Sequence, residues 1–349
     1  MWQIGSLSKR RRKASYSANR YQETLFSSLL RCENQIVTSR LAVLLLAGAM
    51  LLGGSAYADS STQTPVAIPA YQFPGLIDGP VPDSLQATLS TTSTDMPKPY
   101  KDHCHVQQNL TATTASCLYG NLASKTTIVL FGDSHALSWF PAIEKLAIAK
   151  KWRLLSLTMS SCWPASIPAW NPSTNILMTN CAIWRKSALS QIAKVKPYIT
   201  FITGTRGFAT VDTDGNVLAG DAKTNAWKSG MAVTLKAVKK ASANTFFISD
   251  TPISLYSFPD CLTYSTESIE FCATPAAIAI DTDWLTVERN LANSVGVTWV
   301  NPTEWICNTD PCSPISKGAL IYRDGGHLTA SFAVQLERQL WGEISSELN

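Results

Sequence analysis

Two segments that lie far apart in the chain carry residue types suited to nucleophilic catalysis. The first, Gly132-Asp133-Ser134-His135, offers a serine hydroxyl, which is a weak nucleophile unless a nearby base accepts its proton. The second, Asp324-Gly-Gly-His327, offers an imidazole with a carboxylate three residues before it. These residues predict ester chemistry in which Ser134 is the nucleophile, His327 the base and Asp324 the group that orients the imidazole.

Each segment also has a simpler structural interpretation. Serine and aspartate are frequent N-caps, so the first segment alone is also typical of a helix start, and the second of a turn followed by an N-cap. The remaining histidines are weaker candidates for the base, because His103 and His105 lie in a cysteine-bearing segment and His135 is expected to point along its helix. The presence of both segments in one chain favours catalysis.

The elements that must position these residues alternate along the chain. Short apolar segments predict five strands, at 126–131, 153–158, 198–203, 245–249 and 297–300. Segments with helical periodicity lie between and after them, at 135–150, 181–193, 226–242, 275–294 and 331–346. This alternation predicts an α/β fold, a three-layer sandwich with a central, mainly parallel five-stranded sheet.

The turn that carries the serine directly follows the first predicted strand and opens a helix. Catalytic groups in parallel α/β folds gather at the carboxyl ends of the strands. The backbone N–H groups at a helix N-terminus favour negative charge, so this position suits the oxyanion of a tetrahedral intermediate.

The N-terminal region resembles an export signal. Arg40 precedes an apolar run over 41–52, and small residues at Ala56 and Ala58 fit a cleavage site before Asp59. We therefore expect 1–58 to be a signal peptide or a retained signal anchor, 59–100 a Ser/Thr/Pro-rich linker or extended wrap, and 101–349 the catalytic domain. A misread core segment is the remaining interpretation of the apolar run. The expected location is periplasmic or extracellular.

Charge and cysteine content agree with export. The leader holds eight Lys or Arg against two Glu, which leaves a net charge of −2 for 59–349. Without a basic surface, nucleic acid is not an expected partner. The eight cysteines after the leader predict disulfides, and although 105 pairings exist, proximity favours Cys104–Cys117, Cys162–Cys181, Cys261–Cys272 and Cys307–Cys312. There is no Cys-x-x-Cys, and we expect neither a metal nor a cofactor.

The two catalytic segments together resemble the SGNH hydrolase (GDSL-like) superfamily, with Asp133-Ser134 in its first block and Asp324-x-x-His327 in its last. Over roughly 100–345 the chain looks like the SGNH domain often fused to membrane acyltransferase-3 domains. That resemblance implies a flavodoxin-like fold and the O-acylation or de-acylation of cell-envelope glycans. Further similar segments are Phe131–Pro141, Ser161–Pro164, Asp250–Pro252, the Cys261/Cys272 loop, Asn301–Cys307 and Tyr322–Thr329.

Two departures from the superfamily concern the oxyanion hole. The second block normally supplies a glycine, whereas this chain has Ser160 and Ser161, either of which could offer its backbone N–H. The third block normally supplies an asparagine, but the third strand ends in Thr203-Gly204-Thr205-Arg206. Arg206 can only donate hydrogen bonds, so it suits an oxyanion or a substrate carboxylate, or is simply a surface residue.

The sequence predicts a serine esterase or an O-acyltransferase that handles short acyl groups, acetyl above all. Its expected partners are an acylated glycan or acyl donor and a separate membrane acyltransferase-3 protein. A non-catalytic glycan-binding protein with the same fold is the alternative, and a lipase-like enzyme a third reading. Four tryptophans near the motif loops are candidates for stacking on sugar rings or, more simply, for core packing: Trp139, Trp163, Trp170 and Trp184.

Overall fold

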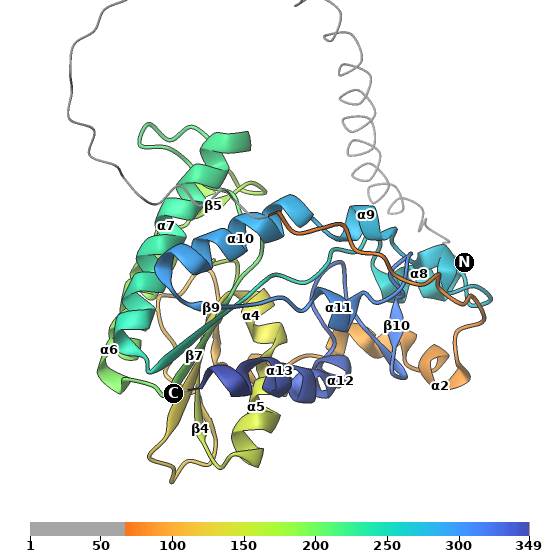
Figure 1. Cartoon of the computed structure of the whole chain (residues 1–349), viewed down its shortest axis with the longest axis horizontal. Coiled ribbons are helices and arrows are strands. Elements are labelled where there is room, and N and C mark those ends of the chain that lie inside the picture. Colours follow the sequence, from red (N-terminus) through yellow and green to blue (C-terminus); the bar gives the residue numbers. More distant parts are fainter. Residues whose placement is uncertain (1–66, 349) are drawn as a thin grey trace, which may run out of the picture. The chain divides into compact units, whose positions relative to one another are not determined.

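A computed structural model describes residues 67–348, and the predicted export signal therefore lies outside the described residues (Figure 1). The described chain is built on a seven-stranded sheet, and the strands of its main path pair in parallel. In spatial order that path is β1 (His105–Val106), β4 (Arg153–Met159), β3 (Thr127–Gly132), β7 (Ile199–Thr203), β8 (Asn244–Ile248) and β9 (Thr298–Val300).

The five predicted strands are β3, β4, β7, β8 and β9, and they form one contiguous sheet. Numbered along the chain, their spatial order is second, first, third, fourth, fifth, which is the flavodoxin-like order. The predicted fold class is therefore confirmed. The sheet also contains β1 and an antiparallel strand β2 (Leu118–Gly120), both paired with β4. These strands are too short to show a periodic pattern.

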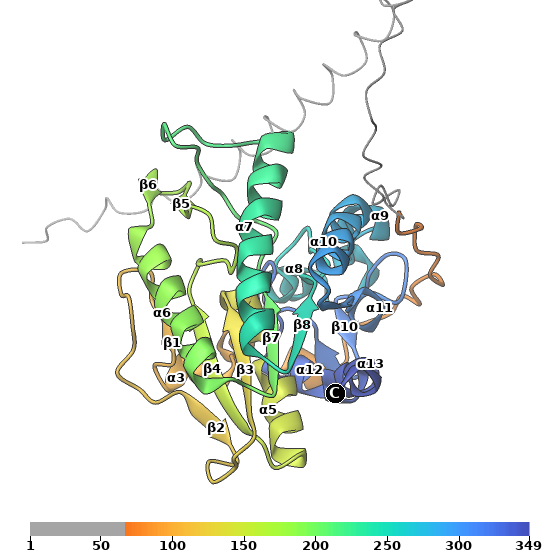
Figure 2. The same ribbon diagram turned by 60° about the vertical axis from the view of Figure 1, so that its left-hand side comes forward.

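Helices cover both faces of the sheet, as Figures 1 and 2 show. Successive residues of β3 point to opposite faces: Ile128 and Leu130 belong to one apolar cluster, and Val129 and Phe131 to the other. The first cluster contains α4 (Ser134–Ser138), α5 (Phe140–Ala149), α12 (Ala330–Ala333) and α13 (Glu337–Ile344), and the second contains α6 (Thr179–Val195), α7 (Gly220–Ala241) and α10 (Thr282–Val295).

Some predicted helices are divided in the structure. The helix predicted over 135–150 is α4 and α5, and Pro141 lies in the first turn of α5, where its missing N–H is harmless. The helix predicted over 275–294 is α9 (Ala276–Ala279) and α10, with Asp281 capping α10 by accepting the Trp284 N–H. The helix predicted over 331–346 is α12, η3 (Val334–Leu336) and α13.

Segments predicted as loops contain short elements. Between β4 and α6 lies the hairpin β5 (Trp170–Asn171) and β6 (Ile176–Leu177). All four predicted disulfides are present. The other short elements are α8 (Phe258–Tyr264), η2 (Glu270–Cys272), α11 (Thr303–Ile306), β10 (Ile315–Ser316) and β11 (Ala319–Leu320).

The described part of the predicted linker lies against the domain. Residues 67–101 include α2 (Asp83–Gln86), η1 (Leu89–Thr94) and α3 (Lys98–Lys101). Val81 and Leu89 are buried in an apolar cluster with Leu320 of β11. Within residues 67–348, no helix is both long and apolar enough to cross a membrane.

Candidate active site

The turn between β3 and α4 depends on Gly132. Its φ is +151°, and a Cβ atom here would lie 1.9 Å from the Thr203 carbonyl oxygen of β7. Glycine thus lets the ends of β3 and β7 approach closely, and the chain then turns sharply into α4. Ser134 is the first residue of that helix.

The fully buried Asp133 is the N-cap of α4. One carboxylate oxygen accepts the His135 N–H at 2.8 Å, and the other accepts the Thr205 N–H at 2.8 Å from the loop after β7. Burial raises the pKa of the Asp133 carboxyl. The capping role therefore belongs to Asp133, which leaves the Ser134 hydroxyl free for another partner.

That partner is His327, which the loop before α12 brings to the serine. Ser134 Oγ lies 2.8 Å from His327 Nε2, and His327 Nδ1 lies 2.9 Å from Asp324 Oδ2. Asp324 also accepts the backbone N–H groups of His327 at 2.8 Å and Gly326 at 3.0 Å. The structure thus brings together the three residues singled out from sequence, in the order that general-base activation of a serine requires.

The electrostatic environment keeps Asp324 ionised. Burial raises the pKa of its carboxyl, but the hydrogen bond and charge of His327 and the two backbone N–H groups outweigh burial. The pKa of Asp324 therefore lies well below its ordinary value. The carboxylate can hold the imidazole with Nδ1 protonated, which leaves Nε2 to accept the serine proton.

A second histidine–aspartate pair lies beside the first. His135 does not point along its helix as expected: its Nδ1 lies 2.6 Å from Oδ1 of Asp250, which follows β8. The His135 and His327 rings are 4.9 Å apart between centroids. Burial opposes the charged form of His135, but the charge and hydrogen bond of Asp250 outweigh it and raise the pKa of His135 to about 9.

Asp250 is the residue that sequence reasoning left without a role. Its carboxylate also accepts the Thr251 N–H at 2.8 Å and the Arg206 N–H at 2.9 Å. Burial raises the pKa of Asp250, but His135 and the Arg206 N–H hold it below its ordinary value. An acidic residue directly after a buried strand was the available signal, since that position is the sheet edge where Ser134 also lies.

The residues predicted for the oxyanion hole lie in the loops after β4 and β7. The Ser160 N–H donates to the Val106 carbonyl at 2.8 Å and is therefore engaged. Ser161 has a positive φ of 54°, its hydroxyl accepts a hydrogen bond from Gln108, and within residues 67–348 no protein group accepts its N–H. Of the two serines, Ser161 is thus the one whose backbone N–H is available to an oxyanion.

Gly204 and Arg206 have structural partners. A Cβ atom on Gly204 would lie 2.5 Å from Pro164 Cδ and 3.1 Å from Asp133 Oδ2, so glycine is required by packing. The Arg206 guanidinium donates to the Ala279 carbonyl at 3.0 Å. This contact directs the guanidinium towards the end of α9.

The tryptophans near the motif loops are largely core residues. Trp139 lies in the apolar cluster beneath α4 and α5, while Trp163 and Trp184 lie in the cluster on the other face. All three are buried, and only Trp170, in β5, is half-exposed. The core-packing interpretation therefore holds for three of the four.

The model of one protein family matches residues 103–341, which is most of the chain, and its description is "SGNH domain (fused to AT3 domains)". The chain belongs to this family. The matched residues lie within 101–349, the range that the sequence predicts to be the catalytic domain. A search of curated proteins finds no match.

Solved structures similar to this SGNH domain include enzymes of acetyl chemistry. The periplasmic domain of a lipopolysaccharide acetyltransferase from Salmonella ser. Paratyphi A is 16% identical, with 65% of this chain and 85% of that chain covered and a TM-score of 0.49. A carbohydrate esterase family 2 enzyme from Myceliophthora fergusii is 16% identical, with 65% and 67% covered and a TM-score of 0.39. A Geobacillus acetyl-xylooligosaccharide esterase is 12% identical, with 64% and 96% covered and a TM-score of 0.35.

Proposed function

We propose that the protein is an exported serine enzyme that cleaves or transfers short acyl esters, acetyl above all, of cell-envelope glycans through an acyl-enzyme on Ser134. The observation that carries the proposal is the alignment of Ser134 Oγ, His327 and Asp324 through contacts of 2.8 and 2.9 Å. Membership of the SGNH family supports ester chemistry, and the fusion of that family to AT3 domains supports acyl transfer.

The first half-reaction forms the acyl-enzyme. Ser134 Oγ attacks the ester carbonyl carbon while His327 Nε2 accepts the hydroxyl proton. The carbonyl oxygen becomes an oxyanion, for which the backbone N–H groups of Ser134 and Ser161 are the proposed donors. The tetrahedral intermediate then collapses, the ester C–O bond breaks, and His327 gives its proton to the leaving alcohol oxygen.

The second half-reaction releases the acyl group. His327 accepts a proton from the acceptor, whose oxygen attacks the acyl carbon, and then returns that proton to Ser134 Oγ as the acyl-enzyme breaks. With water as acceptor the enzyme is an esterase, and with a sugar hydroxyl it is an O-acyltransferase. Both outcomes use the same three residues and differ in how well the site excludes water.

Export and partnership complete the proposal. The apolar run over 41–52, the small residues before Asp59 and the four disulfides fit a protein that works outside the cytoplasm. A separate membrane acyltransferase-3 protein is the proposed source of acyl groups, because the family is typically fused to such a domain.

Hydrolysis of p-nitrophenyl acetate tests the serine. Ser134→Ala should lower kcat by at least about 10³-fold, since removal of a triad nucleophile leaves only binding and oxyanion stabilisation. The matched control is Ser173→Ala, an exposed serine in the turn between β5 and β6. Equal rates for wild type and Ser134→Ala would refute the proposal. Adding a glycan acceptor and detecting acylated product by mass spectrometry separates transfer from hydrolysis.

A further inference from the structure

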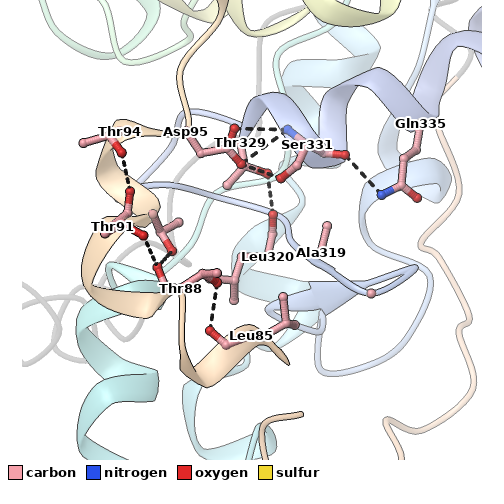
Figure 3. A pocket seen from close by; sticks show the side chains of 12 residues that line it. Leu85, Thr88, Thr91, Thr94, Asp95, Ala319, Leu320, Thr329, Ser331 and Gln335 are labelled. Atoms are coloured by element: carbon pink, nitrogen blue, oxygen red, sulfur yellow. Dashed lines mark hydrogen bonds between the residues drawn. The ribbon is translucent and has the colours of Figure 1, made fainter. Parts of the chain in front are cut away.

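Residues 81–101, here called the strap, lie against the loop that carries Asp324 and His327. The strap comprises α2, η1 and α3 and precedes the part of the chain that matches the family. Residues of η1 and of the start of α12 line one pocket of about 440 Å³. Figure 3 shows the hydrogen bonds between Asp95 and Ser331 at this pocket.

The first contact caps α12. The Asp95 carboxylate accepts the Ser331 hydroxyl and, at 3.3 Å, the Ser331 N–H, while the Asp95 carbonyl accepts the Ala330 N–H at 3.1 Å. Ala330 and Ser331 form the first turn of α12, where N–H groups have no partner within the helix. Because α12 begins three residues after His327, the strap fixes the chain immediately beyond the catalytic histidine.

The second contact fixes the chain immediately before the triad carboxylate. Tyr100 Oη accepts a hydrogen bond of 3.2 Å from Arg323 Nη2, and the guanidinium carbon lies 5.2 Å from the centre of the Tyr100 ring. The Arg323 side chain is buried, and its Nη1 lies 3.4 Å from Asp324 Oδ2. A buried guanidinium needs fixed partners, so Tyr100 holds this charge beside the carboxylate that orients His327.

The strap is itself anchored at both ends. The Val81 N–H donates to the Thr266 carbonyl at 2.7 Å, within the loop closed by the Cys261–Cys272 disulfide. At the other end, the Pro99 carbonyl accepts the Cys104 N–H at 2.8 Å, next to the Cys104–Cys117 disulfide. An element held in this way can constrain the loop that it contacts.

We propose that the strap belongs to the catalytic apparatus, with Asp95 and Tyr100 as positioning residues that keep the 322–331 loop where Asp324 holds His327 against Ser134. This inference rests on the proposed esterase or acyltransferase function. Displacement of a catalytic group by about 1 Å can cost roughly 10²-fold in rate. Loss of either contact, each beside the Asp324–His327 pair, should therefore lower the rate measurably.

The test compares Asp95→Ala with the conservative Asp95→Asn, whose side-chain oxygen still accepts from Ser331. Asp95→Ala should lower kcat for p-nitrophenyl acetate by about tenfold or more with KM changed less than twofold, and Asp95→Asn should restore most of the rate. Tyr100→Phe keeps the ring, loses the hydrogen bond to Arg323 and should lower kcat in the same way. Thr91→Ala is the control, because its hydroxyl bonds only within the strap.

Hydrogen exchange provides a readout that does not depend on activity. In Asp95→Ala the Ser331 amide loses its carboxylate acceptor and should exchange at least tenfold faster, while the amides of β3 and β7 keep wild-type rates. Wild-type exchange at Ser331, or acceleration spread over the whole sheet, would overturn the inference. If the wild-type protein hydrolyses no ester, the proposed function fails, whereas the exchange pattern still decides whether the strap holds the loop.

Discussion

The buried pair of His135 and Asp250 makes stability depend on pH in a defined window. Replacing Asp250 by Asn removes the charge 2.6 Å from His135 Nδ1 and leaves a side chain of the same shape. Because the His135 ring is mostly buried, its charged form is disfavoured without Asp250, and the ring should be neutral at neutral pH. The expected result is that the titration of His135 near pH 9 disappears from the folded protein.

The size of the effect follows from the pKa of His135, which the folded protein raises from 6.5 to about 9. At about 1.4 kcal/mol per unit, this shift corresponds to roughly 3 kcal/mol. A raised pKa means that the stabilisation is fully present below pH 6.5 and is lost as the pH rises through 9. The free energy of unfolding should therefore fall by roughly 3 kcal/mol across this window because of His135.

The carboxyl of Glu288 titrates in an overlapping pH range, so its effect must be removed from the comparison. Burial raises the pKa of Glu288 from 4.5 to about 8, so its contribution is also lost as the pH rises. Glu288→Gln keeps an oxygen that can accept the Trp284 indole N–H. Urea unfolding between pH 6 and 10 should therefore compare Glu288→Gln with the double variant Glu288→Gln/Asp250→Asn.

The difference in unfolding free energy between these two variants should shrink by roughly 3 kcal/mol from pH 6.5 to 9. The single variant should be the more stable of the two at the acidic end. Parallel curves across the whole window would show that His135 carries no charge held by Asp250, and would refute this account of the pair.

Two further substitutions test the turn and the triad. Asp324→Asn should lower kcat for p-nitrophenyl acetate by about 10⁴-fold, because an amide can hold the wrong tautomer of His327, and a loss of less than tenfold in steady-state kinetics would contradict its orienting role. Gly132→Ala should lower the free energy of unfolding by at least about 2 kcal/mol, because its Cβ would collide with the Thr203 carbonyl oxygen, and an unchanged urea midpoint would show that β3 and β7 are not so closely packed there.

Much of the fold was predictable from local pattern. The five strands are short and continuously apolar because both faces of the sheet are covered, and that pattern is visible without any knowledge of contacts. The helix divisions at Pro141 and Asp281 also have local causes, a proline and an N-cap, which the helical periodicity masked.

The site was predictable where residue chemistry is distinctive and hidden where it depends on long-range contact. Ser134, Asp324 and His327 were identified because a serine needs a base and the chain has only four histidines. The contact between His135 and Asp250 joins residues 115 positions apart, and that between Asp95 and Ser331 joins residues 236 apart. No local sequence pattern indicates either contact. For this reason the sequence alone predicts that His135 points along its helix.

The strap illustrates the same limit. Its composition of serine, threonine and proline is typical of a linker. Nothing in that composition indicates that Tyr100 contacts the loop before α12 or that Asp95 contacts the first turn of α12. Thr92 and Leu89 are buried because they face the domain, and burial of this kind is decided by tertiary packing.

Covalent labelling tests whether Ser134 is an activated nucleophile. The protein is treated with a fluorophosphonate probe, which reacts with activated serine hydroxyls, and the labelled residue is identified by peptide mass spectrometry. We expect one label per chain, on Ser134, with labelling abolished in Ser134→Ala and strongly slowed in His327→Ala. Absence of label from the folded wild-type protein, or a label that persists in Ser134→Ala, would contradict this expectation.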